Sequence, residues 1–326
     1  MPEHAVSSAE LTGVCQRLAA HYTALAEKES ARGAAGYARL DKEQMQCLRL
    51  LESCLNSGLW KQVRDLAEAI NTYLDRQGHW TEKLTAVGMR LTAARQSGDR
   101  DDEMWSLYSL GYTYDRCGEQ EKALAWAKQS LSIARELQHK EGEGWILNNM
   151  ADIYRQQGKY KQALEQFQKS LTIMQEIGDK EGEGMTLNNI GMVYYNQNDY
   201  KTALEYYEKC LPISKKVGDQ TREGITYNNI ATVYRMKGDT TKALEYYKQD
   251  LSICQQLGDK AGEAQSRWNF GLTYEDIGDL AKADEYISQA VQIAETIDHP
   301  KLEEYRKGLA RVRAARQAAQ GKGGEA

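Results

Sequence analysis

Proline is nearly absent from this chain, which has only 3 among its 326 residues. Because proline removes a helix hydrogen bond, so few prolines favour long uninterrupted helices. An excess of basic charge is absent too, since 42 lysines and arginines stand against 47 aspartates and glutamates. That balance argues against a nucleic-acid surface, which usually carries a basic excess. No window approaches the roughly 20 apolar residues that a membrane-spanning helix needs, so we expect no membrane contact.

Targeting and disulfide signals are also missing. The first residues, MPEHAVSSAE, lack the basic-then-apolar pattern of a secretory signal. The six cysteines include no CxxC pair, and an even count implies disulfides mainly in short secreted chains. Each cysteine lies in an apolar helical pattern, where a free thiol behaves as a small hydrophobic residue. We therefore expect a soluble, helical, cytoplasmic protein with buried free thiols.

Motifs for catalysis are absent as well. The chain has no HExxH, GxSxG or GxGxxG motif and no His–Cys cluster with metal spacing. One glutamate recurs in each row of the repeat described below, which suggests paired carboxylates: Glu103, Glu143, Glu183, Glu223 and Glu263. Each is expected in the first turn of a helix, where negative charge complements the helix dipole. We expect no enzyme activity, no cofactor and no metal.

A period of 40 residues organises the chain from Asp101 to Pro300. Five successive rows share one skeleton with no insertion, and fixed-period self-similarity is the signature of a stacked repeat array. One alanine recurs in every row, which allows two helix backbones to approach closely: Ala123, Ala163, Ala203, Ala243 and Ala283. The rows therefore predict a series of identical helical units.

Each row predicts two helices. In the row that begins at Glu181, apolar residues follow the spacing of an amphipathic helix: Leu187, Ile190, Gly191 and Tyr194. Gly178 suits the left-handed position that ends the preceding helix, and Asp179 is a good N-cap. Asn198 stands where the other rows have glycine, so the first helix should end there. The second helix is predicted from about Tyr200 to Lys216.

The pattern L-x-x-[IM]-[GA]-x-x-Y, then G, then A-x-x-x-[FY], resembles the tetratricopeptide repeat (TPR). The resemblance implies an all-α fold, a right-handed α-solenoid or superhelix of stacked helix–turn–helix units. The 40-residue form with a repeated Asn-Asn looks like kinesin light chains, spindle-orientation adaptors and bacterial signalling TPR proteins. In such proteins the first helices line the concave groove.

The segments outside the five rows are weaker copies. We expect residues 1–60 to form an N-terminal helical cap or degenerate repeat, 61–100 a degenerate repeat, 101–300 five repeats, 301–318 a C-terminal capping helix and 319–326 a disordered tail. The helix from Ser8 to Glu29 should carry an apolar stripe that includes Leu11, Val14 and Leu18. Residues 31–38 are predicted to be a linker.

The first 100 residues have a second resemblance. The runs RLAAHYTALAE, LDKEQMQCLRLLESCLNSGLW and YLDRQGHWTEKL look like the arm that joins the nucleotide-binding part of bacterial STAND signal-transduction NTPases to a TPR sensor. No GxxxxGK[ST] occurs, so no phosphate-binding loop is present. The chain is then either a sensor arm of a larger protein or a free-standing relative.

A row of asparagines is the most informative constellation. Asn149, Asn189, Asn229 and Asn269 share one row position, and Asn148, Asn188 and Asn228 precede the first three of them. Asparagine offers a donor and an acceptor, so such a row can hold the backbone of an extended peptide. The alternative is that one asparagine of each pair bonds the neighbouring repeat, because buried polar groups need partners.

Other groove candidates lie around the asparagines. Trp105 and Trp145 share one row position, Arg155, Tyr195 and Arg235 another. Rings with charges suit a peptide that has apolar anchors and some acidic residues. Each tryptophan could instead pack on a neighbouring helix.

Three functions are consistent with these observations. The first is a protein-protein interaction module that binds a partner protein or peptide in the concave groove, as a monomer or with weak self-association. The second is a sensor arm that binds a peptide or small ligand and acts on an effector domain. The third is an architectural self-assembling scaffold, since repeat ends can stack.

Overall fold

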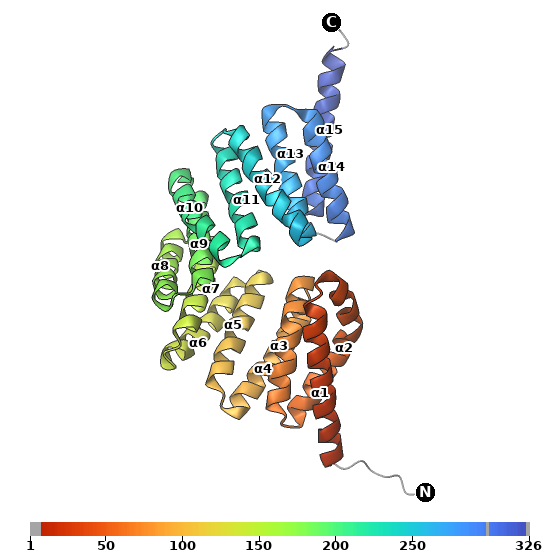
Figure 1. Cartoon of the computed structure of the whole chain (residues 1–326), viewed down its shortest axis with the longest axis vertical. Helices are drawn as coiled ribbons and strands as arrows, with labels where there is room; N and C mark the ends of the chain where they lie inside the picture. The colour runs from red at the N-terminus through yellow and green to blue at the C-terminus, as the bar shows by residue number, and fades with distance from the viewer. Residues whose placement is uncertain (1–7, 298–299, 324–326) are drawn as a thin grey trace, which may run out of the picture. The chain divides into compact units, whose positions relative to one another are not determined.

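The computed structural model describes residues 8–297 and 300–323. These residues form fifteen α-helices and no strand (Figure 1). Their bounds are α1 Ser8–Ser30, α2 Ala34–Asn56, α3 Trp60–Gln77, α4 Trp80–Ser97, α5 Arg100–Arg116, α6 Gln120–Glu136, α7 Lys140–Gln156, α8 Tyr160–Ile177, α9 Lys180–Asn196, α10 Tyr200–Val217, α11 Gln220–Met236, α12 Thr240–Leu257, α13 Lys260–Ile277, α14 Leu280–Thr296 and α15 Leu302–Gly323. The expected all-α stack of consecutive helix pairs is confirmed.

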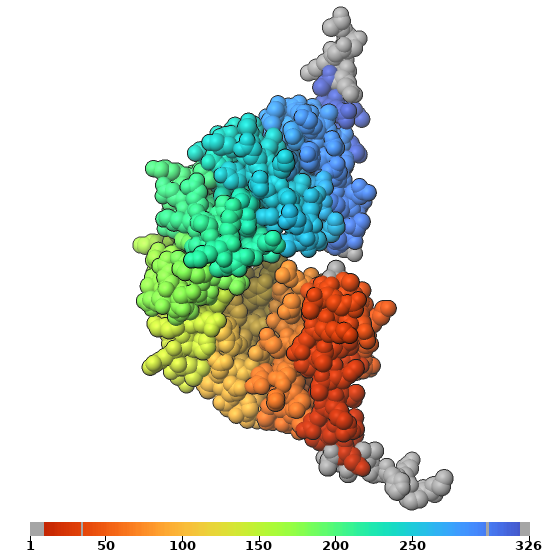
Figure 2. All heavy atoms as spheres, viewed as in Figure 1, coloured from red at the N-terminus to blue at the C-terminus, as the bar shows by residue number. Residues whose placement is uncertain are grey.

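The chain divides into two compact units, residues 1–173 and 174–326, with the boundary inside α8. Within the second unit, α9 packs on α10, α11 on α12 and α13 on α14, and each pair contacts the next. Figure 2 shows the atoms of α11 to α14 as one continuous packed surface. None of the helices in the described part of the chain is long and apolar enough to cross a membrane.

The helix boundaries follow local capping chemistry. Asp179 accepts a hydrogen bond from the backbone N–H of Gly182, which caps α9 as predicted. Gly178, with φ of 73°, occupies the left-handed conformation that ends α8. Asn198, with φ of 61°, takes the left-handed position that glycine holds in the other four rows. Gln138 does the same between α6 and α7, with φ of 54°.

Small residues bring the two helices of a repeat together. The recurring alanines of the second helices are all 0% exposed: Ala123, Ala163, Ala203, Ala243 and Ala283. In the first row, a Cβ on Gly111 of α5 would lie 3.2 Å from the carbonyl oxygen of Ala123 in α6. This close approach explains why both positions remain small.

The N-terminal helices belong to the core of the first unit. Side chains of α2, such as Leu51 and Cys54, share one buried cluster with Leu66 of α3. The predicted linker at residues 31–38 is wrong for most of its length, because α2 begins at Ala34. Gly36 makes this sharp entry possible, since a Cβ there would lie 1.8 Å from the Glu29 carbonyl oxygen.

One half of the predicted apolar stripe of α1 is uncovered. Leu11, Val14 and Leu18 are 54%, 40% and 44% exposed, whereas Tyr22 is half-buried against the core. The stripe therefore packs only along its C-terminal part.

The C-terminal helix covers the end of the second unit. α15 packs on α14, and the Tyr305 ring stacks on Trp268 of α13 with centroids 4.8 Å apart. The helix continues to Gly323, beyond the end predicted at residue 318, so residues 319–323 are helical and not disordered. Residues 324–326 of the expected tail lie outside the described residues.

Helix α10 contains a proline. It continues through Pro212, whose side chain is exposed, so the helix tolerates the proline without ending.

All six cysteines are free, and Cys47, Cys54, Cys210 and Cys254 are buried as expected. The expectation is wrong for Cys117, which is exposed because it follows the last turn of α5.

Candidate functional site

The predicted groove residues lie on the first helices of the repeats. In the first unit, Trp105 is half-buried and meets Tyr108 and His139 edge to face, with centroids 5.8 Å apart in both pairs. Trp145, one row later, is also half-buried. In the second unit, Ile225 holds the same row position and is 41% exposed. Trp105 thus packs on neighbouring rings, while Ile225 presents an apolar side chain to solvent.

The asparagines bond across successive repeats. The Asn229 side-chain amide donates to Asn188 Oδ1 at 3.0 Å, and the Asn269 amide donates to Asn228 Oδ1 at 3.3 Å. Asn188 and Asn269 are buried, at 1% and 8% exposure. These bonds join α9 to α11 and α11 to α13, which is the arrangement expected if the asparagines connect neighbouring repeats.

In the first unit the row of asparagines begins differently. Asn148 is 3% exposed, and Asn149 is half-buried with a side-chain oxygen that has no hydrogen-bond partner. One row earlier, Tyr108 stands where the next three rows have the first asparagine of the pair. In the second unit, Asn189 is half-buried on α9.

The predicted groove cations are compensated within the protein. Arg155 bonds Asp152 on its own helix at 2.7 Å. Arg235 of α11 bonds Asp276 of α13 at 2.6 Å. Tyr195 is half-buried near Tyr200, and burial raises the pKa of its hydroxyl. None of these three residues joins the pocket described next.

A pocket of about 180 Å³ lies among α11, α12 and α13 of the second unit. Its walls combine apolar side chains with amides and carboxylates, among them Ile225, Asn228, Asn229, Ile253, Asp259 and Gln265. Ile225 and Gln265 share the row position of Trp105 and Trp145, and the two asparagines are those predicted from the sequence. The lining of the pocket therefore includes Asn228 and Asn229, two of the residues that the sequence predicts to bind a peptide.

Asp250 of α12 forms part of the pocket wall although it is only 4% exposed. Its Oδ2 accepts a hydrogen bond from Asn228 Nδ2 at 2.8 Å, and the Cys254 thiol donates to Oδ1 at 3.5 Å. Burial raises the pKa of this carboxyl to about 6, against the opposing effect of its hydrogen bonds. Burial and the nearby Asp250 charge also raise the pKa of the Cys254 thiol, which therefore stays protonated.

A directional chain of amides ends at this carboxylate. Lys301 Nζ donates to Gln265 Oε1 at 2.9 Å, and Gln265 Nε2 donates to Asn269 Oδ1 at 3.2 Å. Asn269 then donates to Asn228, which donates to Asp250. Hydrogen bonds arranged head to tail polarise one another, so the chain holds the amides of the pocket in fixed orientations.

Asp250 was not among the residues predicted for the groove, yet the sequence contains a signal for it. Four other rows hold a small side chain at this position: Ser130, Ser170, Cys210 and Ala290. Ser170 shows the ordinary arrangement, because its hydroxyl donates to the Gly144 carbonyl of the paired first helix at 2.8 Å. A charged residue at a row position that otherwise holds small, mostly buried side chains therefore marks Asp250 as unusual.

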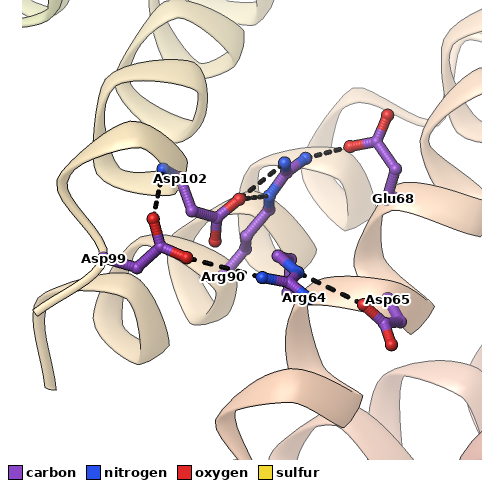
Figure 3. Close-up of polar contacts among 6 residues, drawn as sticks. All are labelled: Arg64, Asp65, Glu68, Arg90, Asp99 and Asp102. Carbon is purple, nitrogen blue, oxygen red and sulfur yellow. Dashed lines mark hydrogen bonds and ion pairs between the residues drawn. The ribbon is translucent and has the colours of Figure 1, made fainter. Parts of the chain in front are cut away.

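The degenerate repeat carries the opposite charge at the same row position, Arg90 of α4. Figure 3 shows its guanidinium between Asp102, at 2.8 Å from Nε, and Glu68. The neighbouring Arg64 bonds Asp65 and Asp99 at 3.2 and 3.4 Å. Two guanidiniums thus meet four carboxylates, so this cluster of the first unit leaves no positive charge for an anion and is a structural ion network.

The recurring first-turn glutamates also have a structural role. Glu103 bonds Arg95 and Glu143 bonds Arg135, each at 2.9 Å, so each links a first helix to the second helix before it. Across residues 8–297 and 300–323, no group of three histidine, cysteine, aspartate or glutamate side chains is placed to hold a metal ion.

Comparisons with solved structures agree with the fold. A Rap protein complexed with competence and sporulation factor superposes with a TM-score of 0.61 at 13% identity, over 95% of this chain and 99% of that one. BtubC (BKLC) from P. vanneervenii gives 0.57 at 22% identity, over 67% and 92%. A STAND ATPase with a tetratricopeptide repeat sensor from Pyrococcus horikoshii gives 0.57 at 19% identity, over 96% of this chain and 51% of that one.

The family follows from the repeats themselves. No curated protein sequence matches the chain. Models of the tetratricopeptide repeat match residues 104–137, 143–216 and 222–296, together more than half of the 326 residues. With helix pairs, caps and small residues placed as such repeats require, the chain belongs to the tetratricopeptide repeat family.

Proposed function

We propose that the chain is a non-enzymatic, cytoplasmic protein-protein interaction module that binds a segment of a partner protein along its first helices. The observation that supports this most is the pocket among α11, α12 and α13, because its lining includes Ile225, Asn228 and Asn229. A concave site with apolar walls and a few fixed polar groups is the usual form of a binding site.

The asparagines contribute by being held in place before binding. Asn229 donates to Asn188, and Asn228 lies between Asn269 and Asp250, so both pocket amides have defined orientations. Groups that are ordered in advance lose less entropy when a ligand binds. In this proposal the asparagines both bond the neighbouring repeat and bind the ligand, because the bonds between repeats also orient the amides that line the pocket.

The comparisons add a precedent for the fold. The Rap protein of similar fold was crystallised with competence and sporulation factor bound. A stack of helix pairs can therefore hold a factor in that protein, and we propose the same kind of use for the present chain.

Site-specific photo-crosslinking tests the proposal. A benzoyl-phenylalanine replaces Ile225, which is 41% exposed at the pocket. A matched probe replaces the exposed Lys209 on α10. We expect the Ile225 probe to crosslink one defined segment of a partner protein, identified by mass spectrometry, and the Lys209 probe to give none of it. Equal crosslinking from both positions contradicts binding along the first helices.

A sensor arm is the second candidate, and the uncovered stripe of α1 favours it. Leu11, Val14 and Leu18 expose an apolar face that fits docking to an effector domain. Because these side chains are exposed, changing all three to serine should leave the fold intact. We expect such a variant to lose co-purification with an effector while retaining crosslinking from Ile225. Unchanged co-purification argues against the sensor arm, and concentration-dependent sedimentation of the unaltered chain tests the scaffold alternative.

A further inference from the structure

The pocket among α11, α12 and α13 has a charge that the protein does not neutralise. Asp250 is 4% exposed, and its hydrogen bonds come from an amide, a thiol and the hydroxyl of Ser266, all neutral. Within the described residues, no ion pair includes its carboxylate. A buried carboxylate without a cation is costly, so such groups are normally paired.

The degenerate repeat shows how this chain treats a charge at the same row position when the charge is structural. Arg90 has a side chain 12% exposed, and its guanidinium bonds Asp102 and Glu68 from the helices on either side. Asp250 has no equivalent partner on α11 or α13. We infer that the pocket receives its cation from the ligand, namely the side-chain ammonium of a lysine in the partner segment, with Asp250 as the counter-ion.

The walls suit a lysine along its whole length. Ile225, Ile253 and Leu257 line the pocket and can contact the four methylene groups. An ammonium has three donors and no acceptor, and the lining of the pocket includes the carboxylate of Asp250 and the side-chain amide of Asn229. Asp259, which caps α13, adds a second negative group to the lining.

The pocket suits an ammonium better than a guanidinium. Arginine presents five donors in a planar fork, and the Arg90 cluster meets them with carboxylates from two helices. At Asp250, Oδ2 already accepts from Asn228 and Oδ1 accepts from Cys254, so the carboxylate has few acceptor sites left for a planar fork. A compact ammonium needs fewer acceptors in one plane, so lysine is the matching side chain.

The charged groups around the pocket do not supply the missing cation. Arg222 on α11 lies 3.8 Å from Asp219, and Lys260 and Arg267 on α13 both bond Glu263. Lys301, just before α15, donates to Gln265 Oε1 at 2.9 Å and not to Asp250. The remaining titratable groups that face Asp250 are Cys254 on its own helix and Asp259 at the start of α13. A lysine ammonium would therefore enter a site of net negative charge.

This inference rests on the proposed function for the source of the lysine, but its test needs no partner. Nα-acetyl-lysine methylamide is titrated into the ¹⁵N-labelled full chain at pH 7.5, and the side-chain amide resonances of Asn228 and Asn229 are followed. The norleucine analogue, which has the same stem without the charge, is the control ligand. We expect saturable shifts with the lysine probe and at least about tenfold weaker binding of norleucine.

Two variants make the test specific to Asp250. Asp250→Ser restores the side chain that Ser130 and Ser170 provide in other repeats, and Asp250→Asn keeps the shape while removing the charge. Glu245→Gln, an exposed site on the same helix, removes an equal charge outside the pocket. We expect both Asp250 variants to weaken binding of the lysine probe by about tenfold or more, and Glu245→Gln to change it less than twofold.

The outcomes separate this inference from the proposed function. Equal binding of lysine and norleucine probes, or unchanged binding by both Asp250 variants, overturns the lysine pocket. Tighter binding of Nα-acetyl-arginine methylamide than of the lysine probe, in the same titration, also overturns it. If the Ile225 probe still crosslinks a partner segment in any of these cases, the interaction surface stands and only its cationic pocket fails.

Discussion

At the scale of single residues, Asp250 makes stability depend on pH in an unusual sense. Burial raises the pKa of its carboxyl to about 6, above the value of about 4 for an exposed aspartate. The unfolded chain therefore releases this proton at lower pH than the folded one does. The corresponding stability is fully present below about pH 4 and is lost as the pH rises through about 6.

Asp250→Asn removes that pH-dependent loss. Two pKa units correspond to about 3 kcal/mol, so we expect the variant to be more stable than the unaltered chain by about 2 to 3 kcal/mol at pH 7.5. The difference should shrink toward zero near pH 4. Urea unfolding at a series of pH values measures it, and a difference that stays constant from pH 4 to 8 contradicts the assignment to this carboxyl.

Gln138 carries backbone strain that its equivalents in other rows avoid. Its φ is 54°, and glycine stands at the same place in Gly98, Gly178, Gly218 and Gly258. A left-handed conformation costs a non-glycine residue roughly 1 to 2 kcal/mol. We expect Gln138→Gly to stabilise the chain by about 1 kcal/mol in thermal unfolding, whereas Gln138→Ala, which keeps a Cβ, should give no gain.

At the scale of the helices, the asparagine row links one first helix to the next. Asn188 and Asn229 share a hydrogen bond of 3.0 Å between α9 and α11. Changing either residue alone to alanine leaves the other amide with one fewer partner in a site where Asn188 is 1% exposed. We expect each single change to lower the unfolding free energy by about 1 to 3 kcal/mol.

A double-mutant cycle isolates the link between the two helices. The double variant Asn188→Ala with Asn229→Ala should lose less stability than the sum of the single losses, with a coupling of about 1 kcal/mol. Asn149→Ala is the matched control, because its side-chain oxygen has no hydrogen-bond partner. Additive losses at Asn188 and Asn229 would show that the bond contributes nothing.

The helix pairs could be predicted from the sequence because their causes are local. Asp179, Gly178 and Asn198 cap or end helices through their own backbone and side chains, so reading them in order was sufficient. The sequence left two alternatives open for the asparagines, since the Asn229–Asn188 bond depends on how one repeat stacks on the next. The small residues at the row position of Asp250 indicate a buried site, but its hydrogen-bond partners depend in the same way on how α11, α12 and α13 pack.

At the scale of the whole array, an end repeat needs a covering helix. Tyr305 of α15 is 0% exposed and stacks on Trp268, which is 6% exposed. A chain that ends at residue 300 would uncover this tryptophan. We expect it to self-associate and to melt at lower temperature, as measured by sedimentation velocity and circular dichroism.

A milder truncation provides the control for the covering helix. A chain that ends at residue 318 keeps Tyr305 and Val312, which are both buried. We expect it to sediment as the full chain does. Monomeric behaviour of both truncated chains would mean that α15 is dispensable as a cover.

Because the repeats share one register, the polar groups of the pocket could be built in another repeat at the equivalent positions. Gly184 and Asn188 hold the row positions of Gly224 and Asn228. The Asn188 amide donates to the Met192 sulfur at 3.7 Å, whereas the Asn228 amide donates to Asp250. Cys210 occupies the position of the aspartate. A single exchange at Cys210 would therefore copy the amide–carboxylate pair one repeat earlier along the chain. Ligand preference in such an array can change by one substitution inside one repeat, while the caps and stacking that define the fold stay as they are.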